Sequence, residues 1–243
     1  MQYWAMAIQA QSNRPGNAIH DADIFHLSES AIVLRARQEY SVAAGQLEVQ
    51  RRIWRLAEQL HSSALPCIDI VPGLHNITVV YDGPQQLAEQ WRTVLEVGWQ
   101  QSATDHGSTT ASGRLIELKA YYGGEYGPDM STVCEHCGLD ENAVIELHSQ
   151  ASYTVAFIGF QPGFPYLLGL PERLNCPRKR KPAQQLAAGS IAIGGVQTGI
   201  YPGDSPGGWQ VIGRLAEPGV LFQHERDEPV LLRAADQLRF IAQ

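Results

Sequence analysis

Hydrophobic and polar positions in the first hundred residues follow two different periods. Some short runs alternate apolar and polar side chains as half-buried strands do, and two longer runs repeat apolar side chains every three to four positions, as amphipathic helices do. The expected elements are two strands within 23–36, a helix over 46–61, strands over 67–71 and 77–81, and a second helix that begins at Pro84. This order predicts a compact α+β domain over residues 23–100.

The pattern changes after this domain. Residues 101–113 contain almost no large apolar side chain, and we expect them to form a linker. Beyond them the apolar runs are short and are separated by Gly and Pro, which is typical of a β-sandwich or barrel. The expected elements are strands over 115–120, 152–158, 191–196 and 209–212, a hairpin over 230–241, and two short helices around Gly138. Residues 114–243 should therefore form a second domain, and residues 1–22 an extension whose composition is compatible with disorder.

Glycine and proline concentrate in one part of the second domain. Residues 159–219 hold twelve of the 23 glycines and eight of the 14 prolines, yet aromatic residues are spread through the same run. Disordered Gly/Pro-rich segments lack such aromatics, because they cannot bury enough apolar surface to become ordered. We therefore expect loops of defined shape, carried on short strands, that line a cavity.

Several motifs in this run and before it resemble one family. They are DIVPG (69–73), YGGEYGPD (122–129), PGFPYL (162–167), AGS (188–190), QTGIYP (197–202) and SPGGWQVIG (205–213). Together and in this order they resemble the KipI family, also called allophanate hydrolase subunit 1-like proteins or 5-oxoprolinase B subunits (PxpB). The resemblance implies a small N-terminal α/β sandwich domain followed by a C-terminal cyclophilin-like β-barrel.

The resemblance also implies a function. It suggests the B subunit of a multi-subunit 5-oxoprolinase, which uses ATP to open 5-oxoproline to L-glutamate and is inactive as an isolated chain. The implied partners are a KipA-type (PxpC) carboxyltransferase-like subunit and a LamB-type (YcsF, PxpA) subunit, with ATP and Mg shared between this chain and a partner. The alternative is a KipI-like protein that inhibits a sensor histidine kinase. Peptidyl-prolyl isomerase activity would rest on the barrel alone, and a fold does not settle function.

Charge and hydrophobicity exclude other classes. The net charge of −7 argues against a nucleic-acid partner, which requires a basic surface. No apolar stretch approaches the ~20 residues that span a bilayer, so we expect no membrane segment. The apolar start of the chain has no basic residues before it and does not resemble a signal peptide. The expected compartment is the cytoplasm.

The Gly/Pro-rich run supplies most of the expected substrate-binding residues. Neutral hydrogen-bonding side chains beside aromatic rings suit a small uncharged amide, and one guanidinium suits a carboxylate. A lactam acid such as 5-oxoproline has both groups. The expected substrate-binding residues are Gln161, Phe164, Tyr166, Arg178, Gln197, Thr198, Tyr201 and Trp209.

Two titratable residues are candidates for catalysis. Glu125, flanked by glycines and aromatics, could act as a base or accept a substrate N–H. His148 is expected to close a helix next to the loops and is the preferred titratable group. Both have structural alternatives: Glu125 could only brace its loop, and the helix dipole alone favours a histidine such as His148 at a helix C-terminus. The neighbouring Asp129 is interpreted as a helix-start residue.

Three further patterns have simpler explanations. Residues 203–207 fit the G-x-S-x-G motif of serine hydrolases, but Pro206 lacks the N–H that an oxyanion hole needs there. Cys134 and Cys137 form a single C-x-x-C, and a structural zinc site generally needs two such pairs, so no bound metal is expected. The four cations at 178–181 are expected in a solvated loop, or on an anion-facing rim. No P-loop motif occurs.

Overall fold

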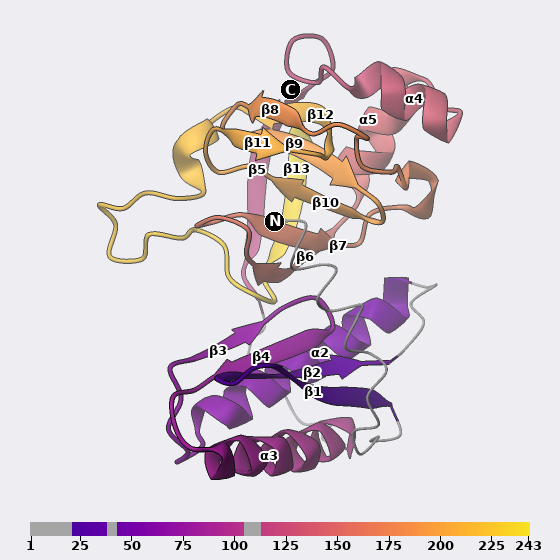
Figure 1. Ribbon diagram of the computed structural model, residues 1–243. Helices are drawn as coiled ribbons and strands as arrows, with labels where there is room; N and C mark the ends of the chain where they lie inside the picture. The colour runs from indigo at the N-terminus through magenta and orange to yellow at the C-terminus, as the bar shows by residue number, and fades with distance from the viewer. Residues whose placement is uncertain (1–20, 38–42, 105–112) are drawn as a thin grey trace. The chain divides into compact units, whose positions relative to one another are not determined.

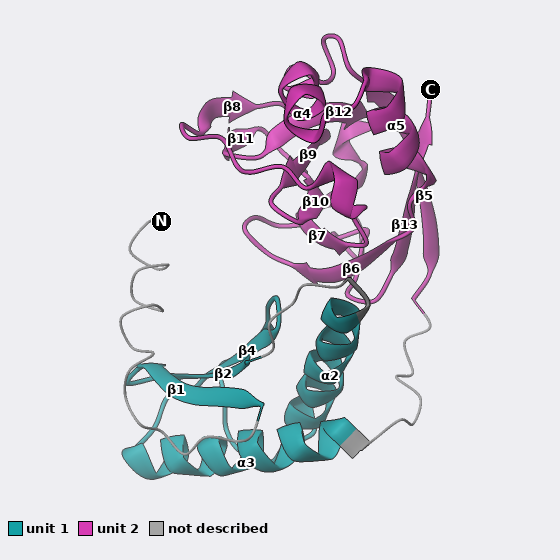
Figure 2. Ribbon diagram, turned by 90° about the vertical axis from the view of Figure 1, so that its right-hand side faces the viewer, with its two compact units in different colours: residues 1–110 teal, residues 111–243 magenta. Residues whose placement is uncertain are grey.

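The computed structural model describes residues 21–37, 43–104 and 113–243, so residues 1–20 of the expected 1–22 extension and most of the expected linker lie outside these ranges. The chain divides into two compact units, residues 1–110 and 111–243 (Figure 2). Residues 101–104, expected in the linker, instead form the last turn of a helix. The buried Ser102 explains this extension, because its hydroxyl donates to the carbonyl oxygen of Trp99 (2.7 Å).

Unit 1 is a four-stranded antiparallel sheet packed against two helices, as the hydrophobic periods predict (Figure 1). Alternate strand residues are buried in a core with the apolar stripes of the helices, which explains the two periods seen in the sequence. In sheet order the strands are β1 (Ala22–Ser28), β2 (Ala31–Ala36), β4 (Asn76–Val80) and β3 (Asp69–Pro72), and the helices are α2 (Ala43–His61) and α3 (Gln85–Thr104).

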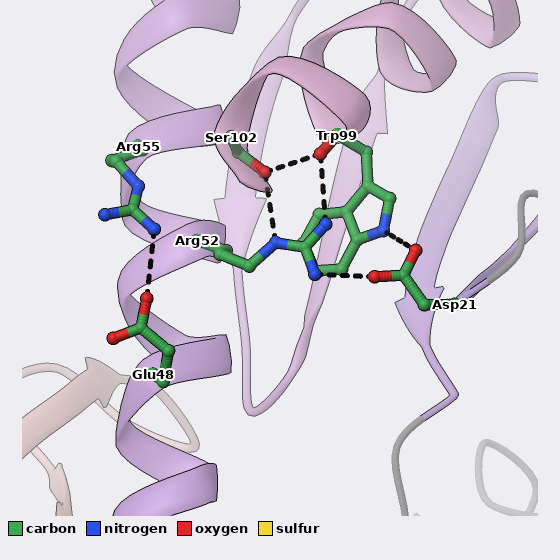
Figure 3. Close-up of polar contacts among 6 residues, drawn as sticks. All are labelled: Asp21, Glu48, Arg52, Arg55, Trp99 and Ser102. Carbon is green, nitrogen blue, oxygen red and sulfur yellow. Dashed lines mark hydrogen bonds and ion pairs between the residues drawn. The ribbon is translucent and has the colours of Figure 1, made fainter. Parts of the chain in front are cut away.

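One arginine joins three elements of unit 1 (Figure 3). Arg52 of α2 lies over the ring of Trp99 at 3.7 Å and donates to the Trp99 carbonyl oxygen (3.1 Å) near the end of α3. It also pairs with Asp21, just before β1, at 2.6 Å, while the Trp99 indole N–H donates to the same carboxylate at 2.7 Å. Partial burial alone would raise the pKa of Asp21, but the hydrogen bonds from Arg52 and Trp99 lower it below its usual value.

The Arg52 cluster gives a stability prediction with a neighbouring control. We expect Arg52→Met to lower the free energy of unfolding of unit 1 by about 1–3 kcal/mol, because it removes the charged hydrogen bonds to Asp21 and to the Trp99 carbonyl oxygen. Arg51→Met removes an exposed pair with Glu48 and should change stability by about 0.5 kcal/mol or less. Urea unfolding, monitored by the hydrogen exchange of backbone amides in α2 and α3, measures the free energy of unfolding of both variants.

The pH dependence tests the same cluster. Because the pKa of Asp21 is lowered by folding, its contribution is present above the unfolded pKa of 3.8 and is lost as the pH falls below it. The difference between wild type and Arg52→Met should therefore shrink in acid. Equal losses for Arg51→Met and Arg52→Met would contradict this assignment.

Unit 2 is a closed seven-stranded barrel with two helices, so the predicted α+β class and β-barrel are confirmed. Neighbouring strands are antiparallel except for the parallel pair β13–β5. In barrel order the strands are β10 (Gln197–Ile200), β7 (Pro165–Leu168), β6 (Tyr153–Ile158), β13 (Gln237–Ala242), β5 (Leu115–Tyr122), β12 (Gln210–Leu215) and β9 (Ser190–Gly194). Outside the barrel, β8 (Ala183–Leu186) pairs with β11 (Ser205–Gly207).

The two short helices form as expected around Gly138. They are α4 (Met130–Cys137) and α5 (Glu141–Gln150), and Gly138 ends α4 in the left-handed conformation at φ 65°. Their apolar side chains pack into the barrel core, and the helices lie together beside the barrel (Figure 1). No helix in the described part of the chain is long and apolar enough to cross a membrane.

The expected hairpin over 230–241 is wrong. Only β13 forms there, between β6 and the parallel strand β5, whereas Val230 makes a single bridge to Phe222. The buried Asp236 supplies the physical reason, because its carboxylate accepts from the backbone N–H (3.0 Å) and the guanidinium (2.5 Å) of Arg114. This contact ties the start of β13 to the start of β5, far away in the sequence.

Candidate functional site

Two glycines on neighbouring strands let aromatic rings lie against the outer face of the barrel. A Cβ on Gly199 of β10 would come within 2.9 Å of the Phe164 ring, and one on Gly194 of β9 would overlap the Trp209 ring. Side-chain carbons do not approach so closely, so each ring occupies the space that a larger residue would fill. This part of the outer face is the candidate site.

Four of the predicted aromatic residues meet there. The Phe164 ring lies at the centre, with its centroid 4.9 Å from Tyr166, 5.1 Å from Tyr201 and 5.7 Å from Trp209, in edge-to-face arrangements. Leu186 of β8 packs on the same cluster. Three of these rings are nearly fully buried, those of Phe164, Tyr201 and Trp209. Together they form a rigid base beneath the surface of the site.

Two predicted glutamines carry buried amide nitrogens without a hydrogen-bond partner among the described residues. Gln197 is 7% exposed and lies two residues before Gly199, on the same outer face of β10. Gln161 lies in the loop before β7, three residues before Phe164. A buried donor without an acceptor is costly, so both atoms are suited to a ligand that supplies carbonyl oxygens.

Arg178 lies at the edge of the cluster, with its guanidinium 5.4 Å from the centroid of the Trp209 ring. Its side chain is exposed, but the backbone around it is fixed, because the Gln210 amide donates to the carbonyl oxygen of Pro177 at 3.0 Å. A guanidinium held over an aromatic ring and open to solvent is available to a carboxylate.

Sequence reasoning missed the ion pair beside Arg178. Lys179 pairs with Asp129 at 2.6 Å, each side chain 18% exposed, and the Lys179 backbone N–H donates to the Gly208 carbonyl at 2.7 Å. Asp129 also accepts from the backbone N–H of Val211 at 2.7 Å and makes no cap bond to its helix. Lys179 is thus not part of a merely solvated loop. No local pattern could have paired residues 129 and 179.

The two phenols of the cluster remain hydrogen-bonding groups at neutral pH. Burial raises the pKa of Tyr166 and of Tyr201 above the usual value, although Arg178 lowers both to some extent. Each phenol therefore stays protonated and can donate or accept a hydrogen bond. Neither would supply a phenolate nucleophile at pH 7.

His148 and Thr198 do not face this site, which corrects their predicted roles. His148 is fully buried in the barrel core, where its Nδ1 accepts from the Tyr122 hydroxyl (2.9 Å) and its Nε2–H donates to the Thr198 hydroxyl (3.0 Å). The Thr198 hydroxyl in turn donates to the Ala192 carbonyl (3.0 Å), which fixes these directions. Burial lowers the pKa of His148 to about 3, so a neutral imidazole braces the barrel from inside.

Glu125 lies on a different part of the surface. Its side chain is exposed, and among the described residues no hydrogen bond or ion pair holds its carboxylate. The adjacent Tyr126 stacks on Tyr121 of β5 at 5.0 Å, and Arg214 lies over the Tyr126 ring at 5.0 Å. Glu125 is therefore open to a partner, but it is not joined to the aromatic cluster by any contact in the described chain.

The serine motif and the cysteine pair lie on short regular elements. Ser205 is in strand β11, and strand β12 rather than a helix follows, so the nucleophile elbow is excluded. Cys134 and Cys137 lie on α4 with free thiols. Among the described residues, no group of three or more His, Cys, Asp or Glu side chains has the arrangement of a metal site. A separate depression lined by Glu117, Lys119 and Glu217 contains none of the predicted site residues.

The candidate site has groups suited to a small polar ligand, but among the described residues it has no free catalytic base. It offers amide donors, phenols, a flat aromatic base and one open guanidinium. Its only carboxylate in contact with the Arg178 segment, Asp129, is occupied by Lys179 and Val211 within the described residues. Chemistry at this site therefore requires groups from elsewhere.

The buried imidazole yields a pH prediction. His148 takes up a proton on unfolding between its folded pKa of about 3 and its ordinary value of 6.5, so it should make unit 2 less stable as the pH falls through this range. The limiting slope is about 1.4 kcal/mol per pH unit for one proton. His148→Gln should remove this slope, and the exposed control His224→Gln should keep it.

Hydrogen exchange of β9 and β10 in urea, measured from pH 4 to 7, gives the required unfolding free energies. If His148→Gln and wild type share one pH dependence, the imidazole is not buried and neutral as described.

Comparisons with known proteins agree with the fold and the motifs. Residues 22–232 match the family model described as carboxyltransferase domain, subdomain C and D. The chain is 44% identical to the 5-oxoprolinase B subunit of Escherichia coli O157:H7 (91% of this chain, 96% of that protein) and 39% identical to that of Haemophilus influenzae (91% and 98%). The crystal structure of TTHA0988 is similar at a TM-score of 0.70 and 33% identity, over 88% of this chain and 39% of that one, so this chain spans about two fifths of its length. The chain belongs to the carboxyltransferase-domain family that these relatives share, the family of 5-oxoprolinase B subunits.

Proposed function

We propose that this chain is the B subunit of an ATP-dependent 5-oxoprolinase that converts 5-oxoproline to L-glutamate. Its partners would be a KipA-type carboxyltransferase-like subunit and a LamB-type subunit, with the LamB-type subunit completing ring opening. The relatives named as B subunits of 5-oxoprolinase, which align over nearly their full length, support this proposal. As proteins named subunits, they also favour a multi-subunit assembly.

The observation that carries the proposal is the match between the donor set and the substrate. 5-Oxoproline has a planar ring amide and one carboxylate. The candidate site has two amide donors that lack a partner within the described part of the chain, on Gln161 and Gln197, together with a flat aromatic base and the open guanidinium of Arg178 at its edge. Arg178 would bind the carboxylate, while neutral groups would contact the ring amide without the cost of burying a charge.

A lactam carbonyl is a poor electrophile, and this chain does not supply the means to activate it alone. ATP with Mg would provide that activation, because phosphate on the lactam oxygen would make the carbonyl carbon a good electrophile. The residues of this chain do not fit the nucleotide by themselves: the sequence has no P-loop, and the described residues have no carboxylate cluster for Mg. We infer that ATP and Mg bind largely on a partner, with the candidate site facing that partner.

The proposal is tested by reconstitution. The isolated chain should show little or no turnover, and co-expression with both partner types should give ATP-dependent loss of 5-oxoproline with formation of glutamate. Robust turnover by the chain alone, or none by the complete assembly, would contradict the proposal.

Arg178 offers a matched pair of variants within one loop. In the assembly, Arg178→Ala should lower kcat/KM for 5-oxoproline by about tenfold or more, because it removes a charged partner of the carboxylate. Arg180→Ala removes an exposed cation two residues away and should stay within about twofold. Thermal unfolding of both should match wild type, and a parallel fall of stability and activity in Arg178→Ala would instead indicate that Arg178 only braces the loop.

The same assay tests Glu125. If Glu125 contributes a base or an acceptor at the partner interface, Glu125→Gln should lower kcat well beyond tenfold while the assembly still forms. Glu117→Gln, an exposed carboxylate on β5, is the control. Near-normal kcat in Glu125→Gln removes this residue from the catalytic set.

A further inference from the structure

The loop between β6 and β7 contains two successive tight turns. In the first, the N–H of Gln161 donates to the carbonyl oxygen of Gly159 at 2.7 Å, which closes a three-residue turn around Phe160. In the second, the N–H of Phe164 donates to the Gln161 carbonyl at 3.0 Å, with Pro162 next and then a glycine at φ 83°, as a type II turn requires. Gln161 is the residue that the two turns share.

Phe160 has an unfavourable backbone conformation. Its φ is 65°, in the left-handed region that residues with a Cβ avoid and that glycine adopts freely. A three-residue turn with positive φ at its centre is rare and strained. Strain of this kind persists where the surrounding structure enforces it, and such sites are often functional.

The Phe160 ring, which the strained turn places at the surface, contributes little to the packing of the fold. Phe160 is 48% exposed, and its ring meets the aromatic cluster only by its edge, at 5.5 Å from the Phe164 centroid and 6.1 Å from that of Tyr201. Phe164 and Tyr201 are each only 2% exposed. Phe160 is thus the most exposed aromatic ring of this group.

The next residue carries one of the unpartnered donors of the site. The Gln161 amide nitrogen is buried, and among the described residues no acceptor lies within hydrogen-bonding distance. Its backbone N–H and carbonyl are both used by the turns, so the side chain is the free hydrogen-bonding group of this residue. Burial without a partner is unfavourable unless a ligand supplies an oxygen.

We propose that Phe160 and Gln161 are specificity residues that contact the ligand, the Phe160 ring covering one face of a planar group and the Gln161 amide donating to its carbonyl oxygen. The ligand class is a small planar amide. The strained turn fixes the two side chains relative to each other, so that the face of the planar ligand and its carbonyl oxygen are recognised together. This inference rests on the proposed function only in taking 5-oxoproline as the substrate of the test.

The first experiment measures turnover of 5-oxoproline by the reconstituted assembly. Phe160→Ala and Gln161→Leu should each lower kcat/KM by about tenfold, mainly through KM, the effect expected from losing one contact or hydrogen bond. Ile241→Ala, an apolar residue 38% exposed on β13, is the control and should stay within about twofold. Turnover within twofold of wild type in both site variants would overturn the proposal.

Thermal unfolding separates binding from bracing of the loop. Phe160→Gly should melt at a higher temperature than Phe160→Ala, because glycine accepts φ 65° without strain, yet both should lose the same catalytic efficiency. If the ring only braces the fold, the two variants instead lose stability and activity together, and the proposal is wrong.

A binding measurement keeps the inference testable if the assembly does not turn over 5-oxoproline. Ligand-observed NMR on the full chain would compare 2-pyrrolidinone, which has the ring carbonyl, with L-proline, which lacks it. We expect saturation transfer to 2-pyrrolidinone in wild type, a weak signal in Gln161→Leu, and none to L-proline. If 2-pyrrolidinone does not bind wild type, or binds Gln161→Leu equally, the proposal fails whatever the fate of the proposed function.

Discussion

The close approach of two aromatic rings to the backbone of β9 and β10 is the constraint on which the candidate site depends. Phe164 and Trp209 occupy the places where side chains of Gly199 and Gly194 would stand. This packing draws the loop before β7 and the loop before β12 onto one face of the barrel. The segment that contains Arg178 is held on the same face, because it contacts the loop of Trp209. Residues from three stretches of chain are thereby fixed before any ligand arrives, which lowers the entropic cost of binding.

The side of β10 that faces the barrel interior is also held in place, by hydrogen bonds. Thr198 points into the barrel, where it belongs to a hydrogen-bonded chain from Tyr122 through His148 to the Ala192 carbonyl. Its neighbours Gln197 and Gly199 point outward, as alternation along a strand requires. The buried chain is fully satisfied, so it stabilises the position of β10 without the penalty of an unpaired polar group. Outside the barrel, by contrast, the Gln197 amide is unsatisfied among the described residues. We propose that a ligand supplies the acceptors which these buried amide donors lack among the described residues.

Local patterns in the sequence were enough for the elements of unit 1, because its strands and helices each bury one face and neighbours along the chain pair with each other. They also located the loops of unit 2 and predicted correctly which aromatic residues lie together. They failed where a partner is distant in sequence. The parallel pairing of β13 with β5, the Asp129–Lys179 pair and the contact of His148 with Thr198 all join residues at least 50 positions apart. The position of His148 near the end of a helix gave no sign of whether its ring points inward. Nor did Phe160 stand out among the aromatics, because its strained φ is a backbone property that residue type does not reveal.

We propose that this chain meets substrate and partner at the outer face around Phe164 and Trp209. Hydrogen exchange of the chain within the reconstituted assembly, with and without 5-oxoproline, tests it most directly. Exchange should slow on assembly and slow further with substrate in residues 159–164, 176–180 and 207–210. The outer face of β13 should show no further slowing when substrate is added. If substrate slows hydrogen exchange elsewhere in the chain but leaves these three segments unchanged, the result contradicts this placement of the site.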